Sequence, residues 1–389
     1  MLEVEREEVD RMNRFLNSAL VFVLTLLLIG CAVDTASQSG EPIGNTQQLW
    51  QASWQQVAGT TFVPQLNSVV TTFVDNSGVH MVGTSTGNRV WYKRVATDGV
   101  TVVVPWAQVP GQGLFFGTQY TPIIVRGTQV LRSRQPYFVF RVITGGDVEY
   151  TTLNHYFIGN TWSWTGTWTT VPTIPNGVLR PVAGTYLSGN NRIYLFYIGV
   201  TDYQPYVTYS DNNASTWTGP YLIGGGQAND LAAVDHHTDA TNHYIELVRR
   251  NRLNGYHSWN RLLDPAALDS SDWRGWYTIP GDVSSLADIG LLVQKTYNFC
   301  ISVTDENNFR PYENCTTYGQ GGDSSTFAAT WTQILPAFDA YWGVNATSYC
   351  TSNDSVPDLC PNGNTKKYDY VTQNGTPPVG YQYVQWELK

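Results

Sequence analysis

A short segment that begins with tryptophan recurs along the chain and limits the fold more than any other feature of the sequence. Close copies are WQQVAG, WAQVPG, WTTVPT, WYTIPG and WTQILP, which begin at Trp54, Trp106, Trp168, Trp276 and Trp331. A looser copy, WTGPYLIG, begins at Trp217, so that the tryptophans follow one another at intervals of 49 to 62 residues. A period of about fifty residues is typical of a repeat whose unit is one blade of a β-propeller.

Each interval has the pattern of four short strands. Between residues 67 and 111 the runs NSVVTTFV, GVHMVG, NRVWYKRV and VTVVVPWAQVPG are separated by the turn sequences DNSG, STG and TDG. Runs of β-branched and aromatic residues between such turns indicate strands, and four antiparallel strands make one propeller blade. A chain with 42% hydrophobic residues and 35 glycines can bury a large all-β core. The sequence therefore predicts an all-β propeller.

The two ends of the repeat region complement each other. The C-terminal run YQYVQWELK resembles a third strand with nothing after it, and the segment LWQASWQQVAG resembles a fourth strand with no blade before it. Pairing them would close the ring and remove exposed sheet edges. We therefore predict six four-stranded blades, the last one closed by the N-terminal strand. Their expected bounds are 66–111, 114–173, 178–225, 228–281, 284–336, and 338–389 together with 48–59.

The N-terminal region has the features of an export signal. Residues 19–29 form an apolar run of the length of a signal-peptide core, and it leads into LIGC. This resembles the lipobox of bacterial lipoproteins, which implies cleavage before Cys31 and acylation of its thiol. Ala32 then implies an outer-membrane lipoprotein of the cell envelope, facing the periplasm or the surface. We expect a signal peptide at 1–30, a flexible tether at 31–47 and the propeller at 48–389, with either Met1 or Met12 as the start.

The other four cysteines lie in the last third of the chain, at Cys300, Cys315, Cys350 and Cys360. An even number fits disulfides in an oxidising compartment. Pairing 300 with 315 and 350 with 360 closes the shortest loops, although three connectivities are open. The spacings are not those of zinc sites, so no metal is expected on these cysteines. A net charge of −9 argues against a nucleic-acid partner.

The starts of the innermost strands would meet at the mouth of the central channel. Counting from each tryptophan places a ring of side chains there: Asn67, Tyr120, Arg180, Asp230, Asp288 and Asp339. Carboxylates so close together would pair with the arginine, hold a cation such as Ca²⁺, or meet a substrate. Cleavage of a glycosidic bond needs two carboxyl groups, so the three aspartates are the candidate catalytic residues. The candidate ligand-binding residues are Asn67, Tyr120, Arg180 and, from outside the counted ring, Trp342. A structural salt-bridge ring is the alternative.

Two further patterns resemble known propeller families. The stretch SDNNASTW, residues 210–217, resembles the Asp-box of sialidases, with Asn212 and Ala214 where that motif has Asp and Gly. The Asp-box is a folding turn, so this resemblance implies the fold and not the activity. The repeats also resemble tandem-repeat propeller lectins, which implies sugar-stacking aromatic rings between blades. The candidate rings are those of Trp91, Trp164, Trp259, Trp273 and Trp342.

We therefore expect a lipid-anchored envelope propeller that binds a glycan or polysaccharide at or near the channel mouth. A glycoside hydrolase, sialidase-like or otherwise exo-acting, is the first alternative, and a protein-interaction scaffold is the second. No cofactor is expected apart from Ca²⁺ in the channel. The sequence leaves open whether the protein cuts or only binds, which sugar it takes, and its oligomeric state.

Overall fold

β-strands make up the regular structure of the described part of this computed structural model. The chain divides into two units, residues 1–49 and 50–389, and every described residue belongs to the second. The described residues are 55–56, 70–75, 77–85, 87–97, 101–112, 120–174, 177–178, 182–187, 189–237, 243–263, 268, 272–281, 283–285, 289–295, 298–307, 311–318, 325–333, 343–350, 365–372 and 381–388. No helix among them is long and apolar enough to cross a bilayer.

Five sheets are each built from consecutive antiparallel strands. Blade 1 contains β2 (Thr71–Asp75), β3 (Gly78–Thr84), β4 (Val90–Val95) and β5 (Val102–Gln108). Blade 2 contains β6 (Ile123–Arg126), β7 (Arg134–Val142), β8 (Val148–Tyr156), β9 (Thr161–Trp164) and β10 (Thr169–Thr170). Blade 3 contains β11 (Ala183–Leu187), β12 (Arg192–Ile198), β13 (Pro205–Ser210) and β14 (Thr218–Leu222). Blade 4 contains β15 (Ala228–His237), β16 (His243–Asn251), β17 (His257–Leu262) and β18 (Tyr277–Thr278), and blade 5 contains β19 (Gly290–Lys295), β20 (Asn298–Thr304), β21 (Pro311–Tyr318), β22 (Ser325–Phe327) and β23 (Thr332–Gln333).

Blades 2 and 5 depart from the expected four continuous strands because their outermost strand is divided into two short strands. In blade 2 both β9 and β10 pair with β8, and in blade 5 both β22 and β23 pair with β21. The two short strands occupy successive stretches of the same third strand. The outermost position is therefore filled by one interrupted strand, which a reading of hydrophobic runs cannot distinguish from a continuous one.

A further sheet joins the two ends of the repeat region. Its order is β1 (Gln55–Gln56), β26 (Tyr381–Leu388), β25 (Thr365–Thr372) and β24 (Gly343–Cys350). Gln55 lies opposite Tyr383 in an antiparallel pair. The N-terminal strand thus pairs with the C-terminal strand, as the sequence of the two ends predicts.

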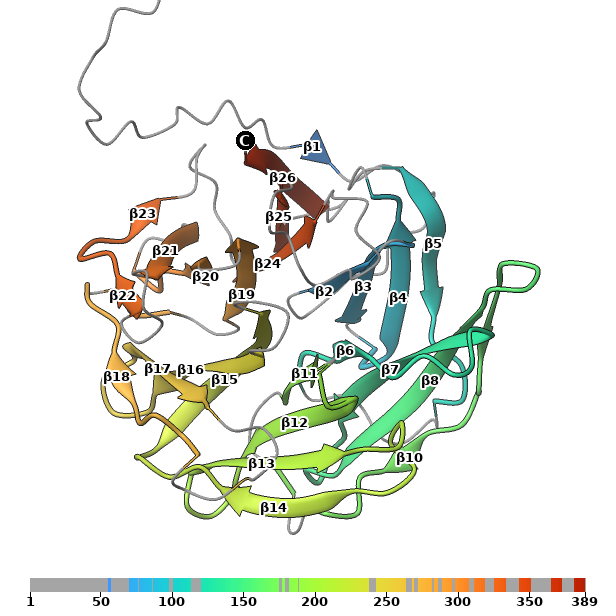
Figure 1. The fold of residues 1–389 in the computed structure, drawn as a ribbon, viewed down its shortest axis with the longest axis horizontal. Helices are drawn as coiled ribbons and strands as arrows, with labels where there is room; N and C mark the ends of the chain where they lie inside the picture. The colour runs from blue at the N-terminus through green and yellow to red at the C-terminus, as the bar shows by residue number, and fades with distance from the viewer. Residues whose placement is uncertain are drawn as a thin grey trace, which may run out of the picture. The chain divides into compact units, whose positions relative to one another are not determined.

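The sheets are arranged around a common centre, which confirms the predicted all-β propeller (Figure 1). The first strand of each sheet contacts the first strand of the next, from β2 to β6, β11, β15, β19 and β24, and β24 in turn contacts β2. These first strands are therefore innermost. The recurring tryptophan segments lie in or beside the outermost strands, as expected.

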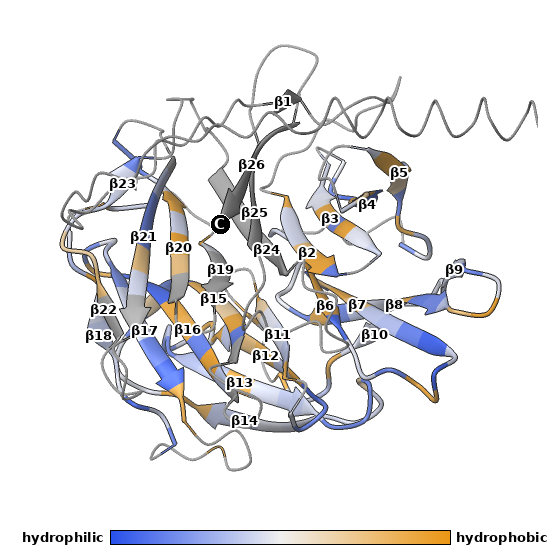
Figure 2. Cartoon of the chain, turned by 45° about the horizontal axis from the view of Figure 1, so that its top comes forward, coloured by the Kyte–Doolittle hydropathy of each residue, from blue (hydrophilic) through white to orange (hydrophobic). Residues whose placement is uncertain are grey.

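The middle strands bury side chains on both faces. In β12 the alternate residues Ile193, Leu195 and Tyr197 belong to the cluster shared with blade 2, and Tyr194 and Phe196 to the cluster shared with blade 4. Successive strand residues point to opposite faces of a sheet, so an uninterrupted apolar run is what a sheet covered on both sides requires. The hydrophobic bands along the strands of blades 3 and 4 are visible in Figure 2.

Three of the recurring tryptophans, Trp168, Trp276 and Trp331, join neighbouring blades through their ring nitrogens. Trp168 Nε1 donates to the carbonyl of Pro110 at 3.0 Å, Trp276 Nε1 to Gly224 at 2.9 Å, and Trp331 Nε1 to Pro280 at 3.1 Å. Each acceptor belongs to the tail of the preceding blade. We call this repeated contact, an indole on the preceding tail, the tryptophan clasp. It gives these three segments a shared structural role.

The clasp between blades 3 and 4 requires glycine beneath the indole. Gly225 has a φ of +82°, and a Cβ atom there would lie 2.0 Å from Trp276 Cδ1. Gly224, one residue earlier, has a φ of +74° but nothing within 4 Å of the Cβ position. The two glycines therefore share a left-handed backbone conformation and differ in the space available to a side chain.

Gly225→Ala is expected to destabilise the protein more than Gly224→Ala does. Both variants place a side chain on a left-handed backbone, which costs about 1–2 kcal/mol. Only Gly225→Ala also displaces the indole, and overpacking of this kind adds about 1–3 kcal/mol. Urea unfolding of both variants measures the difference in free energy of unfolding. Equal losses would show that the indole is not held tightly on the preceding tail.

Candidate functional site

Most of the predicted channel-mouth ring lies outside the described residues. This holds for Asn67, Arg180, Asp288 and Asp339, and also for the candidate ligand-binding residue Trp342. Their convergence on one mouth stays a prediction. The same is true of Cys31 and of the pairing of Cys350 with Cys360.

Asp230, one of the three candidate catalytic aspartates, is a buried residue near the start of β15. It is 4% exposed, its Oδ1 accepts the amide of Leu231 at 2.9 Å, and it lies opposite Arg250 on β16. Arg250 in turn lies 3.4 Å from the carboxylate of Glu306. Asp230 therefore occupies the strand start where the sequence places it, across from a cation of its own blade.

Tyr120, the other described member of the ring, packs on the hydrophobic cluster between blades 2 and 3. Its carbonyl accepts the Thr84 hydroxyl at 3.3 Å, which links it to blade 1. Its partly buried ring is therefore engaged in packing.

Arginine, glutamate and tryptophan meet at the boundary of blades 1 and 2. Arg141 on β7 and Glu149 on β8 lie directly opposite each other in the ladder. Arg141 Nη2 and Nε donate to Glu149 Oε2 at 2.7 and 3.0 Å, and the guanidinium carbon lies 4.0 Å from the centre of the Trp168 ring. Trp168 is the clasp residue bonded to Pro110 of blade 1. We call this group the boundary site.

Blade 1 contributes Gln112 to the boundary site. Its Oε1 lies 3.3 Å from Arg141 Nη1 and also accepts the amide of Val90 at 2.8 Å. Its Nε2 donates to the carbonyls of Val90 and Val109 at 2.9 and 2.7 Å. Gln112 is thereby fixed to blade 1, and the boundary site is built rigidly from two blades.

The boundary site is buried at the arginine and only partly exposed at the glutamate. The side chain of Arg141 is 4% exposed and that of Glu149 is 18% exposed, while Trp168 is half-buried. Burial lowers the pKa of Arg141, and the carboxylate of Glu149 opposes that shift. A partly exposed carboxylate beside an aromatic ring can accept hydrogen bonds from hydroxyl groups on a ring with an apolar face.

The sequence contains a signal for this pair. Arg141 and Glu149 stand at equal distances from the centre of the turn in FRVITGGDVEY, so a hairpin must bring them together. Opposite charges placed symmetrically about a turn indicate a cross-strand ion pair. The third partner, Trp168, follows only from the packing of the outer strand.

Blade 4 repeats the arrangement without the carboxylate. The guanidinium of Arg249 lies 4.1 Å from the Trp276 ring centre, and Ser258 is opposite it in the ladder. Arg249 Nη1 and Nη2 donate to the carbonyls of Gly226 and Gly225 at 2.9 and 2.8 Å. In blade 4 the arginine therefore stabilises the tail of blade 3 through its backbone carbonyls.

Two of the predicted sugar-stacking rings are unsuited to that role in this structure. Trp259 is 3% exposed and Trp273 7%, so neither offers a free face. Trp259 Nε1 donates to Glu246 Oε2 at 2.6 Å, and Glu246 also forms a buried ion pair with Arg261 at 2.6 Å. The sequence pattern of an isolated tryptophan near a strand end does not reveal whether its ring faces a neighbouring blade. Trp91 and Trp164 are half-buried.

The Asp-box-like stretch forms a closed turn between β13 and β14. Asn212 Oδ1 accepts the amide of Thr216 at 2.8 Å, and Ser210 Oγ accepts that of Ala214 at 2.9 Å. Ala214 adopts a φ of 62°, and its carbonyl accepts the hydroxyl of Tyr150 from blade 2 at 2.8 Å. The turn therefore has a structural role.

A buried Asp, Ser and His cluster in blade 1 has the residue types of a hydrolase triad but another geometry. Ser77 Oγ and Asp75 Oδ1 both face His80 Nε2, at 2.9 and 3.5 Å, while His80 Nδ1 bonds the Tyr92 hydroxyl at 2.9 Å. In a nucleophilic triad the acid and the nucleophile hold opposite ring nitrogens. Ser77 also donates to Asp75 at 2.6 Å, so its proton is directed away from the base.

The carboxylate of that cluster is held in its charged form. Burial alone would raise the pKa of Asp75, but hydrogen bonds from His80, Ser77 and Tyr137 outweigh it and hold the pKa well below its ordinary value. Tyr137 belongs to β7 of blade 2. The cluster therefore joins blades 1 and 2 around a fixed negative charge.

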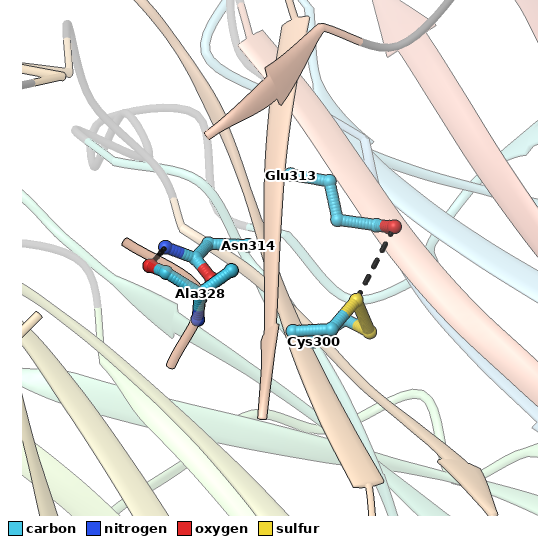
Figure 3. Close-up of a disulfide and its surroundings, with 5 residues drawn as sticks. Cys300, Glu313, Asn314 and Ala328 are labelled. Atoms are coloured by element: carbon cyan, nitrogen blue, oxygen red, sulfur yellow. Dashed lines mark hydrogen bonds between the residues drawn. A yellow bond between two sulfur atoms is a disulfide. The ribbon is translucent and has the colours of Figure 1, made fainter. Parts of the chain in front are cut away.

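The disulfide predicted between Cys300 and Cys315 is present and joins β20 to β21 (Figure 3). Glu313 Oε1 lies 3.4 Å from Cys315 Sγ, and because a disulfide sulfur carries no proton this is a contact and not a hydrogen bond. Metal binding by Cys needs the thiolate, so the group of Cys300, Glu313 and Cys315 is not a metal site while the bond is intact. Beside it, Asn314 exchanges two hydrogen bonds of 3.0 Å with the backbone of Ala328.

Comparison with known proteins relates the chain to solved propellers by fold. No protein-family model and no curated protein matches it. AofleA from Arthrobotrys oligospora is similar with a TM-score of 0.57 and 10% identity, over 87% of this chain and 89% of that one. The NanB sialidase from Streptococcus pneumoniae has a TM-score of 0.56 and 9% identity, over 86% and 70% of the two chains. The Hadza microbial sialidase Hz136 has a TM-score of 0.52 and 10% identity, over 84% and 66%.

His257 should make stability depend on pH in the acid range. It is fully buried on β17, bonded to Ser285 Oγ at 2.9 Å, and burial together with the charge of Arg250 lowers its pKa to about 3. The unfolded state takes up a proton near pH 6.5 and the folded state does not. This contribution to stability is therefore complete above pH 6.5 and is lost as the pH falls toward 3, by at most about 1.4 kcal/mol per pH unit.

Urea unfolding of the wild type and of His257→Gln between pH 7 and pH 4 measures this contribution. The variant is expected to be less stable at pH 7 and to lose less stability on acidification. Parallel pH profiles would contradict the assignment of the neutral buried state to His257.

Proposed function

We propose that the protein binds carbohydrate and that the boundary site is where it does so. The observation that carries this proposal is the Arg141 and Glu149 ion pair lying against the Trp168 ring between two blades. A pyranose presents hydroxyl groups at its rim and C–H groups on its face. The charged pair suits the hydroxyls, and the exposed part of the indole suits the C–H groups.

The rigidity of the boundary site supports binding. Gln112 and Trp168 are both fixed to the tail of blade 1, so a ligand would find the donors already oriented. Preorganised groups cost less conformational entropy on binding than mobile ones. The sialidase folds among the structural neighbours agree with a carbohydrate role, at the level of fold.

We also propose that the ring has six blades. The pairing of β1 with β26 supports this number, as do the contacts of β24 with both β19 and β2. The N-terminal strand would then complete the last blade. Hydrolysis by Asp230, Asp288 and Asp339 at the channel mouth stays a prediction from the sequence.

Removing either charge at the boundary site should weaken glycan binding. A charged hydrogen bond contributes about 1.5–3 kcal/mol, so Arg141→Ala and Glu149→Gln should each raise the Kd roughly 10- to 150-fold. A glycan array with the wild type selects the ligand, and titration calorimetry then measures the variants.

Arg192→Ala is the matched control for the boundary-site variants. Arg192 also pairs with a carboxylate, that of Asp211, and lies 3.8 Å from the ring centre of Tyr209, but it belongs to blade 3, at the start of β12. Its loss should leave the Kd unchanged. Equal weakening in all three variants, or no change in any, would place glycan binding elsewhere.

We further propose that Cys31 anchors the protein in the outer membrane, on the basis of the apolar run and the LIGC sequence alone. Cys31→Ser should then abolish labelling by radioactive palmitate in cells, because the acylated thiol is missing. Gel autoradiography after metabolic labelling measures this. Label retained by the variant would exclude the anchor.

A further inference from the structure

Two loop ends side by side on blade 2 expose large apolar residues. Leu131, in the turn between β6 and β7, is 92% exposed, and Phe157 and Ile158, between β8 and β9, are 42% and 84% exposed. The amide of Phe157 donates to the carbonyl of Ser133 at 3.0 Å, which places the two turns together. With Tyr156, which is 37% exposed, these residues form what we call the blade 2 tip.

Exposed large hydrophobic residues are concentrated at the blade 2 tip, whereas the others in the described part of the chain are scattered. The tip holds four of the nine large hydrophobic residues that are exposed in the described part of the chain. Contiguous exposed apolar residues mark interaction surfaces, whereas isolated ones are ordinary. Figure 2 shows the hydrophobic turn beside β9, at the end of the β8 and β9 hairpin.

The backbone holds Leu131 outward. Leu131 and Arg132 have φ values of 43° and 53°, a left-handed conformation that is unfavourable for side chains of this kind. The turn is fixed because the amides of Ser133 and Arg134 both donate to the carbonyl of Val130, at 2.9 and 3.2 Å. Strained residues held by their surroundings point to a function for the exposed side chain.

The charge at the blade 2 tip is positive, although the whole chain carries −9. Arg132 is exposed beside Leu131, and the half-buried Arg134 lies opposite Tyr156 in the ladder. The tip therefore combines exposed apolar side chains, the amphipathic ring of Tyr156 and two nearby arginines. Proteins use this combination to bind the interface of an anionic bilayer. Two convex turns also suit a fluid lipid surface better than a preformed protein pocket.

We propose that the blade 2 tip inserts Leu131, Phe157 and Ile158 into the interface of an anionic lipid bilayer, with Arg132 against the lipid headgroups. This contact is independent of the boundary site and of any acyl chain on Cys31. It would be a second point of attachment, and it would fix the orientation of the propeller on the membrane.

Hydrogen exchange of the full chain tests the contact, because it reports on each segment separately and is not confused by the apolar N-terminal run. Vesicles of phosphatidylcholine with 25% phosphatidylglycerol should slow amide exchange at 130–134 and 155–160. The turn that carries Leu253, which is also 92% exposed, should be unaffected. Pure phosphatidylcholine vesicles should protect the two turns less, because Arg132 then lacks anionic partners.

The variants separate lipid insertion from other causes of protection. The double substitution Leu131→Ser with Ile158→Ser should lose the protection at both turns, and Leu253→Ser should keep it. The changed side chains are exposed, so the melting temperature should hold and serves as the folding control. Protection that persists in the double variant, or none with anionic vesicles, overturns the proposal. So does protection that rises with protein concentration in the absence of lipid, since this would mean a second copy of the chain.

Discussion

Every middle strand of this propeller must be covered on two faces, and the rest of the structure depends on that constraint. A single sheet cannot bury both of its apolar faces, so each blade relies on its two neighbours. In β12 alternate side chains pack against blade 2 and against blade 4. The tryptophan clasp adds a directional bond at the rim of such a boundary, where the outer strand would otherwise meet water. Stability therefore resides between the blades more than within any one of them.

The fold could be predicted from the sequence because its determinants are local. The Trp-led tails, the β-branched runs and the turns each lie within a few residues of one another, and they give the blade limits directly. The boundary site could be predicted only in part. The pairing of Arg141 with Glu149 follows from symmetry about a turn. Trp168 joins them from beside the outer strand of the same blade, and Gln112 joins them from blade 1, and neither contact can be predicted from the local sequence. Asp230 is found at the predicted strand start, and nothing local in the sequence indicates that Tyr137 reaches Asp75 from the next blade.

Comparison of blades 2 and 4 shows how one repeat can be specialised by one residue. Arg141 and Arg249 occupy the same place against a clasp tryptophan. Opposite Arg249 is a serine, and the guanidinium bonds to backbone carbonyls. Opposite Arg141 is a carboxylate that remains partly open to solvent. The clasp itself uses a carbonyl as its acceptor, which every residue possesses. Side chains can therefore change freely around it, in keeping with a fold shared with proteins of about 10% identity.

The length of β8 sets the distance between the two surfaces of blade 2. The strand runs from Val148 to Tyr156, with Glu149 near its first residue and Tyr156 at its last. Seven steps of about 3.3 Å separate the two by roughly 23 Å. A lipid surface at one end therefore leaves the other end well clear of the headgroups and facing away from them. If both proposals hold, the boundary site would be directed toward long, flexible polysaccharides that approach from the far side, whereas the short headgroup sugars of the supporting membrane would be out of range.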